Sequence, residues 1–379
     1  MDTKSFKAGH YRKQAEYKSF SPEPINKEWV ITEPKLVALL SQADRKLGEL
    51  AAASKWAPDI DYFIKMYIAN EALKSSRIEG TQSTMEEAIG KADEIDPERR
   101  DDWQEVQNYI KAINTAIERL KTLPLSNRLL KETHEILLEG ARGKQKNPGE
   151  WRRSQNWLGP SLKNAVFVPP SHEEVPDLMS DIEKFLMNDS ISVPPLLRIA
   201  MAHYQFETTH PFLDGNGRLG RLLITLYLVN EKILERPTLY LSDFFERNRI
   251  EYYDRRTRVR THNDLSGWLQ FFFVGVIETA ENSIHAFEQI VELKHTLDGE
   301  MLPKLGKRAT RGAKVLQCFY KYPVLYRIEI EEDCGMSTST ANRLLAEFVK
   351  LGVLRKTKGL SRANRYVFDA YLNIFKNDG

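Results

Sequence analysis

The amino-acid sequence predicts a mainly α-helical protein that carries one β-hairpin and ends in a winged helix-turn-helix module. Three observations support this fold class. Apolar residues recur at helical spacings along most of the first 300 residues. The helical period disappears only between Gly140 and Pro170, where short aromatic and β-branched runs flank a turn. After residue 302 the chain shows a separate order of helix, helix and two strands.

The helices are assigned in order along the chain. Residues 1–35 lack a clear period and are expected to form a loosely organised arm. Helical spacing runs from about residue 33 to residue 73, Gly80 then ends a helix, and Thr84 caps the start of the next one. Further helices are expected over residues 103–121, 126–138, 175–187, 195–208, 218–229, 243–256 and 265–298.

The two β-containing segments follow from local patterns. Residues 151–170 are predicted to form the hairpin, because WRRSQNWLG and NAVFVPP are short and aromatic or β-branched, with the turn-rich GPSLKN between them. In the C-terminal segment, RGAKVLQCFY is amphipathic, and STSTANRLLAEFVKLG begins with hydroxyl caps. VLRKTKGLSRANRYVF then gives two strands around a basic turn, which completes a winged helix-turn-helix pattern.

Charge separates this C-terminal segment from the rest. From Pro303 onward 15 Lys and Arg stand against 7 Asp and Glu, a net charge of +8, whereas the preceding residues have a net charge of −6. A basic module on a mildly acidic body predicts two different tasks. We therefore expect a winged-helix domain over 303–379, separate from a body that comprises an N-terminal helical region over 1–110 and a second domain over 111–302.

Composition narrows the class of protein. The 379 residues exceed one ordinary core, and 41% hydrophobic with 28% charged residues are typical of a folded, soluble protein. No apolar run reaches the length of about 18 residues that a membrane-spanning helix needs. The polar N-terminal segment lacks the apolar core of a secretion signal. Cys318 and Cys334 are too few for a disulfide scaffold or a zinc site, so a cytoplasmic location is expected.

One stretch, HPFLDGNGRLGR at residues 210–221, gathers chemistry suited to a phosphate chain. The run Gly215, Asn216 and Gly217 allows a sharp turn whose N–H groups form an anion nest at the start of a helix. The helix dipole adds positive potential there. Arg218 and Arg221 are three residues apart, so they lie on one helical face and can bind further phosphate oxygens.

Two other residues of this stretch fit a phosphate site. Asp214, beside the nest, suits one coordination position of a Mg²⁺ that is otherwise held by phosphates and water. His210 precedes a proline, which favours an extended conformation at a helix end. Its imidazole is placed to act as a general base near neutral pH.

The stretch resembles the Fic motif HPFx(D/E)GNGRxxR, and every defined position matches. The resemblance extends to LKETHEILL, to WRRSQNWLG…FVPP, to LLRIAMAHYQFETTHPF and to RNRIEYYDRR, and covers residues from about 30 to 290. The C-terminal segment is similar to the winged-helix appendage of many bacterial three-domain members. The resemblance implies a Fic-type helical bundle with a hairpin flap around residues 155–170, which holds the target protein as an added strand.

The resemblance also implies an activity, the transfer of AMP from ATP to a Ser, Thr or Tyr hydroxyl of a target protein with release of pyrophosphate. His210 would take the hydroxyl proton, and Asp214 would hold Mg²⁺ against the phosphates. Arg218 would contact the outer phosphate and Arg221 the inner ones. The remaining nucleotide contacts that it implies are Gly215, Asn216, Gly217, Leu219, Gly220, Tyr252 and Tyr253.

A second motif, SSRIEGT at residues 75–81, resembles the Fic inhibitory motif (S/T)xxxE(G/N) through Ser75, Glu79 and Gly80. A carboxylate on a docked helix can pair with an arginine that ATP needs. We therefore expect Glu79 to pair with Arg221 and to inhibit transfer.

Several alternatives stay open at the level of sequence. The C-terminal segment can bind DNA through its recognition helix and the wing residues Arg355, Lys356, Lys358, Arg362 and Arg365, or it can dock protein or form a homodimer. The chain can instead be a DNA-binding regulator that uses the Fic body as a nucleotide sensor. Transfer of UMP or GMP, and removal of AMP, are further alternatives.

Overall fold

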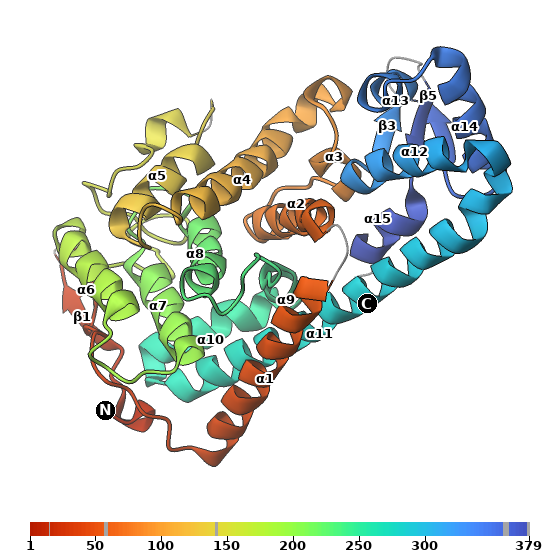
Figure 1. Cartoon of the computed structure of the whole chain (residues 1–379). Coiled ribbons are helices and arrows are strands. Elements are labelled where there is room, and N and C mark those ends of the chain that lie inside the picture. The colour runs from red at the N-terminus through yellow and green to blue at the C-terminus, as the bar shows by residue number, and fades with distance from the viewer. Residues whose placement is uncertain (15, 57–59, 141–142, 359–363, 377–379) are drawn as a thin grey trace.

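The computed structural model describes residues 1–14, 16–56, 60–140, 143–358 and 364–376. These residues form a mainly helical protein, as predicted, with a two-stranded and a three-stranded antiparallel sheet (Figure 1). None of the helices in these ranges combines the length and apolar content that crossing a membrane requires.

The helices of the body follow the predicted spacing closely. They are α1 (Pro34–Trp56), α2 (Ile60–Ile78), α3 (Met85–Ala88), α4 (Arg100–Arg119), α5 (Asn127–Leu137), α6 (Val175–Met187), α7 (Pro195–Thr209), α8 (Asn216–Asn230), α9 (Ser242–Arg247), α10 (Arg249–His262) and α11 (Leu265–Thr296). Gly80, with φ of 111°, follows the end of α2, and Thr84 caps α3 in a capping box. The single helix predicted over 243–256 is divided into α9 and α10 at Asn248.

Helices α7 and α8 form the centre of the body. They pack against each other, and nearly every residue of both is buried, which agrees with their apolar residues on all faces. Helices α4 and α5 contact α8, while α6 and α11 contact α7. The stretch 210–215 joins α7 to α8, so the motif lies on a pair of buried, mutually packed helices.

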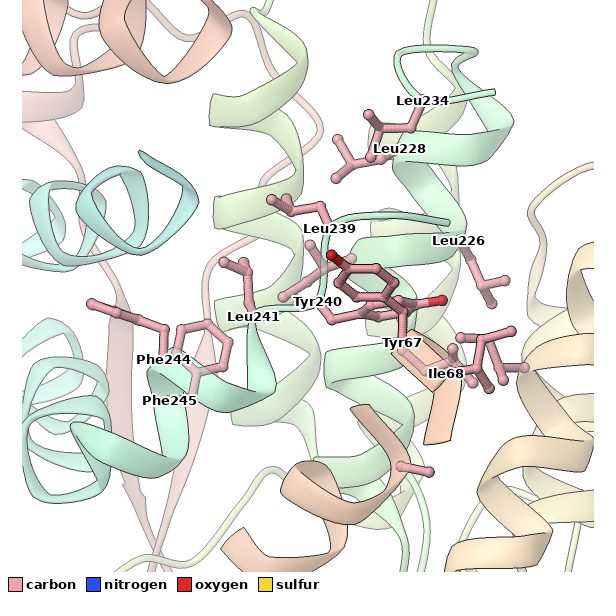
Figure 2. Close-up of a cluster of buried hydrophobic side chains, with 14 of the residues drawn as sticks. Tyr67, Ile68, Leu226, Leu228, Leu234, Leu239, Tyr240, Leu241, Phe244 and Phe245 are labelled. Atoms are coloured by element: carbon pink, nitrogen blue, oxygen red, sulfur yellow. The ribbon is translucent and has the colours of Figure 1, made fainter. Parts of the chain in front are cut away.

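Helix α2 is part of this core. Its Tyr67 and Ile68 lie in a buried cluster with side chains of α8, of the following loop and of α9 (Figure 2). The rings of Tyr67 and Tyr240 stack with centroids 6.5 Å apart. α2 also buries the polar residues Glu71, Lys74, Ser75 and Ser76. The helix that carries the predicted inhibitory motif is therefore held along its length.

Two predictions for β-structure were wrong in detail. The expected loose arm instead contains a hairpin of β1 (Gly9–Lys13) and β2 (Lys18–Pro22), and Phe6, Phe20 and Trp29 of this region are buried in the core. The hairpin predicted over 151–170 is reduced to one antiparallel bridge between Leu158 and Phe167. The prolines at 160, 169 and 170 cannot donate to a ladder, which prevents a longer pairing there.

The C-terminal part contains the predicted helices and strands together with further elements. Its elements are α12 (Ala309–Lys321), β3 (Val324–Tyr326), α13 (Arg327–Cys334), α14 (Thr338–Lys350), β4 (Arg355–Lys358), β5 (Asn364–Val367) and α15 (Asp369–Lys376). The sheet order is β3-β5-β4. Strand β3 and helices α13 and α15 were not anticipated. Arg362 of the predicted wing lies outside the described residues. The division into the three domains 1–110, 111–302 and 303–379 stays a prediction.

This C-terminal part packs directly on α2 and on the segment that follows it (Figure 1). Phe63 of α2 contacts Tyr320 and Tyr371, with ring centroids 6.4 Å and 5.9 Å away. Arg365 Nη2 lies 3.3 Å from a carboxylate oxygen of Glu86. The residues around the inhibitory motif thus contact both parts of the molecule.

Candidate functional site

The motif loop is closed by its own residues. His210 ends α7 with φ of 49°, and Gly215 precedes α8 with φ of 72°. Asn216 Oδ1 accepts from Phe212 N at 2.9 Å, and its Nδ2 donates to Phe212 O at 2.9 Å. Gly215 at the N-cap has no side chain that could cap α8, so the N–H groups of its first turn are left for another acceptor. The loop thus has the turn at the start of a helix that the sequence predicted, and its role in binding an anion stays a prediction.

His134 of α5 supports the loop, and the sequence analysis did not single it out. Its Nδ1 accepts from Gly149 N at 2.9 Å, which leaves Nε2 to donate to Asp214 O at 3.0 Å. The ring stacks on Phe212 with centroids 3.6 Å apart. Burial lowers the pKa of His134 to about 4, so the ring is neutral near pH 7.

Arg152, a second residue that the sequence analysis missed, ties residues 151–170 to the loop. Its side chain is buried, its Nε donates to His210 O at 3.0 Å, and its backbone N donates to Pro211 O at 2.9 Å. Nη2 donates to Pro170 O at 2.5 Å. Burial lowers the pKa of Arg152 to about 10, and carbonyl oxygens solvate the guanidinium. The segment predicted to bind a target is therefore fixed beside His210.

His210 faces this site as a neutral base. Its Nδ1 is enclosed and has no hydrogen-bond partner among the described residues. Burial lowers the pKa of His210, and the Glu207 carboxylate acts in the opposite direction. A neutral imidazole near pH 7 can accept a proton from a hydroxyl group.

Arg218 and Asp214 lie on one side of the loop. Arg218 Nη1 donates to Glu105 Oε2 of α4 at 3.2 Å, and its Nη2 lies 3.8 Å from Asp214 Oδ1. Arg218 is almost fully buried, whereas the Asp214 side chain is 48% exposed. Asp214 Oδ1 also accepts from Gly215 N at 2.6 Å.

Arg221 is paired with both ends of the predicted inhibitory motif. Its Nη2 donates to Glu79 Oε1 at 2.7 Å and to Ser75 O at 2.8 Å, and its Nε donates to Ser75 Oγ at 2.9 Å. Burial alone would lower the pKa of Arg221, but the adjacent Glu79 carboxylate raises it above its usual value. A Cβ on Gly217 would collide with Glu79 Oε1. The carboxylate thus lies on the first turn of α8, where an external anion would bind.

Other predicted nucleotide contacts lie elsewhere. Leu219 is completely buried in the core, and Gly220 lies against Phe206 and Glu207. The Tyr252 hydroxyl donates to His203 Nε2 at 2.8 Å, in the buried interior, because its helix turns this ring inward. These three residues support α8 rather than line the open side of the loop, which corrects the expectation.

Tyr253, by contrast, keeps access to solvent. Its side chain is 38% exposed. Partial burial of the ring raises the pKa of Tyr253, and the Glu79 carboxylate raises it further. Tyr253 therefore lies within electrostatic reach of the pair formed by Glu79 and Arg221.

The fit for a metal ion rests on Asp214. The described residues contain no group of three or more His, Cys, Asp or Glu that could hold a metal. A single half-exposed carboxylate suits Mg²⁺, which usually keeps its waters and is bound through one or two carboxylates and substrate phosphates. Asp214 thus fits a metal that arrives with a nucleotide.

The buried histidines predict a loss of stability in acid. His134 and His203 both have pKa values lowered to about 4 by burial, whereas an unfolded histidine titrates at about 6.5. Between these values the unfolded chain binds more protons, so the free energy of unfolding falls as the pH falls from 6.5 towards 4. Urea unfolding of the His134→Gln variant should show a difference between pH 7 and pH 5 that is smaller than wild type by about 2 kcal/mol.

The control for this measurement is His295→Gln, which removes an exposed ring and should keep the wild-type pH dependence. An unchanged pH dependence in His134→Gln would contradict the assignment of a buried, neutral ring.

Comparisons with known proteins match two stretches of the chain to family models, and the second includes the motif loop. Residues 37–118 match the Fic/DOC family N-terminal model, and residues 124–228 match the Fic/DOC family model. Over 147 residues the chain is 30% identical to protein adenylyltransferase fic-1 of Caenorhabditis elegans, and this match covers 36% of this chain and 26% of that protein. Over 82 residues it is 38% identical to protein adenylyltransferase Fic of Drosophila erecta, and this match covers 21% of this chain and 15% of that protein. The matches thus span about a quarter or less of these relatives.

The fold agrees as well. A Fic family protein from Desulfovibrio desulfuricans G20 has a solved structure that superposes with a TM-score of 0.55 and 21% identity, over 89% of this chain and 96% of that chain. This likeness concerns the fold alone. The chain therefore carries a Fic/DOC family N-terminal domain over residues 37–118 and a Fic/DOC family domain over residues 124–228.

Proposed function

We propose that this protein is an adenylyltransferase that moves AMP from ATP to a Ser, Thr or Tyr hydroxyl of a target protein, itself included. The observation that carries the proposal is a single loop, residues 210–215, which joins the neutral His210 to the first turn of α8 and to the two arginines of that helix. The matched relatives bear the name protein adenylyltransferase, which supports the same activity.

In this proposal the site binds the triphosphate by its backbone and its arginines. The first N–H groups of α8 contact phosphate oxygens, with Arg218 on the outer phosphate and Arg221 on the inner ones. Asp214 would hold a Mg²⁺, which would neutralise charge on the phosphates and the leaving group. No metal-specific cage is required, because the nucleotide supplies the other ligands.

The transfer step balances without another reactant. The target hydroxyl loses its proton to the neutral imidazole of His210 as its oxygen attacks the α-phosphorus. The bond from the α-phosphorus to the oxygen that bridges to the β-phosphate breaks, and pyrophosphate leaves. The products are AMP-modified protein and pyrophosphate.

The target segment is placed on residues 155–170. Trp157 and Leu158 are each 43% exposed and Val166 is 85% exposed, although all three are hydrophobic. A single bridge leaves backbone groups in this segment available to an added strand. Arg152 fixes the segment next to His210, which brings a docked hydroxyl to the base.

Inhibition follows from the position of Glu79. Its carboxylate occupies the first turn of α8 and one Nη group of Arg221, so the inner phosphates lose both partners. Transfer of UMP or GMP, AMP removal and a pure nucleotide-sensing role in a DNA-binding regulator are the competing functions. Transfer assays with differently labelled nucleotides, carried out on the Glu79→Gly variant described next, distinguish these functions.

Glu79→Gly is expected to raise transfer of labelled AMP from ATP to protein. A charge-assisted hydrogen bond to arginine contributes roughly 1.5–3 kcal/mol, so its loss should raise transfer about tenfold to a hundredfold. Adding Arg221→Ala should remove the gain, because the freed guanidinium is its cause. Glu98→Gly, at an exposed glutamate, is the control. Wild-type or lower transfer by Glu79→Gly at every ATP concentration would show that Glu79 does not inhibit.

His210→Ala, made in the Glu79→Gly chain, is expected to lower transfer about 10²–10⁴-fold, because it removes the general base. ATP affinity measured by calorimetry should change little, since the phosphates contact α8 and the arginines. His262→Ala, at an exposed histidine, is the control. Unchanged transfer would remove His210 from the mechanism.

For the C-terminal part, both DNA binding and docking within the chain remain candidates. Asn342 and Arg343 on α14 and Lys356 and Lys358 on β4 are exposed, which favours DNA. Arg365, also predicted to contact DNA, lies instead against Glu86, which favours docking on the segment after α2.

Fluorescence polarisation with duplex DNA at roughly 50 and 200 mM salt tests whether the C-terminal part binds DNA or only docks within the chain. If the part binds DNA, affinity should fall steeply with salt, and Lys356→Ala with Lys358→Ala should reduce the salt slope by about two. Substitution of the exposed Lys35 and Lys121 is the control. Absence of binding at low salt would leave the docking role.

A further inference from the structure

Both arginines of the motif are paired with carboxylates from the N-terminal helices, and the two pairs differ. Glu79 follows the last residue of α2 and precedes Gly80, and its side chain is 37% exposed. Glu105 lies in the second turn of the 20-residue helix α4, and its side chain is 22% exposed. It contacts Arg218 at 3.2 Å.

The backbone under Glu105 is held firmly. The neighbouring residues Val106, Asn108 and Tyr109 are buried, and α4 packs on α2, α5 and α8. Tyr109 donates a hydrogen bond to Glu71, and Asn108 donates one to the carbonyl of Glu139 at 2.6 Å. Release of the short segment around Glu79 therefore leaves Glu105 in place.

The pair also leaves part of Arg218 available. Glu105 contacts Nη1, while Nη2 is directed towards Asp214 at 3.8 Å. Nε is buried and has no hydrogen-bond partner among the described residues. A guanidinium has five N–H donors, so one carboxylate fixes its plane without using all of them. Asp101, Glu105, Asp214 and Arg218 line a common cleft that opens beside the motif.

We propose that Glu105 is a positioning residue that fixes the Arg218 guanidinium at the place of the outermost phosphate and so makes the site prefer ATP to ADP. The proposal rests on the proposed function, because it takes a nucleotide as the ligand. Glu79 is an inhibitory carboxylate that leaves when ATP binds, whereas Glu105 stays. Loss of Glu105 frees the long side chain of Arg218 to rotate, and ordering it again costs ATP affinity.

The test measures nucleotide binding by calorimetry in the full chain with Glu79→Gly, using ADP and a non-cleavable α,β-methylene analogue of ATP. Adding Glu105→Ala should weaken binding of the analogue on the order of tenfold and leave ADP binding within about twofold. Glu105→Gln keeps an acceptor for Nη1 and should recover most of the loss. In the presence of Arg218→Ala, Glu105→Ala should add nothing, because the two residues act as one unit.

Glu139→Ala is the matched control. This carboxylate lines the same cleft but pairs with Lys111 at 2.6 Å, so both affinities should stay at their starting values. Equal weakening of both nucleotides would assign Glu105 to the structure of α4 and overturn the proposal. Tighter binding of the analogue would make Glu105 a second inhibitory carboxylate and overturn it as well. If the Glu79→Gly chain binds neither nucleotide, the proposed function itself fails.

Discussion

The buried guanidinium of Arg221 is the constraint on which the arrangement of the site depends. The Arg221 side chain is only 2% exposed. Burying its charge costs folding free energy unless an anion and further hydrogen bonds surround the guanidinium. In this structure Glu79 and Ser75 supply them, so the end of α2 is tied to the start of α8. In the proposed function, a phosphate of the nucleotide takes the place of the Glu79 carboxylate. The state in which Arg221 has neither partner is the least stable, so the pairing of Glu79 with Arg221 is the resting arrangement of the nucleotide-free chain.

A second set of contacts keeps the motif loop rigid while this exchange takes place. Neutral His134 and the amide of Asn216 hold the loop by its own backbone, and Arg152 joins it to the neighbouring segment. None of these contacts uses an ion pair, so a change of charge above α8 does not disturb them. A preorganised loop beneath an exchangeable anion is an arrangement that favours catalysis, since little reorganisation is needed when the substrate binds.

The sequence predicted what depends on short spacings and missed what depends on distant contacts. The helices, the nest, and the pairing of Glu79 with Arg221 follow from periods or from motifs of a few residues. His134 and Arg152 lie 80 and 58 positions from the residues they hold, and no local pattern marks them. Tyr252 and Tyr253 are adjacent, and only the orientation of α10 decides that the first is buried and the second is not. The N-terminal hairpin was missed because its order comes from aromatic packing on a core that the sequence does not display.

The absence of a side chain at Gly217 has an evolutionary consequence. In the proposed function, the space above this residue serves both the inhibitory carboxylate of Glu79 and a phosphate of the substrate. A mutation that fills it would remove the inhibitor and damage the catalyst together, so selection cannot use this position to alter control alone. Heritable changes in control that preserve activity must arise in Ser75, Glu79 and the helix that carries them. The N-terminal region is thus the part of the gene in which regulation can diverge while the chemistry is inherited unchanged.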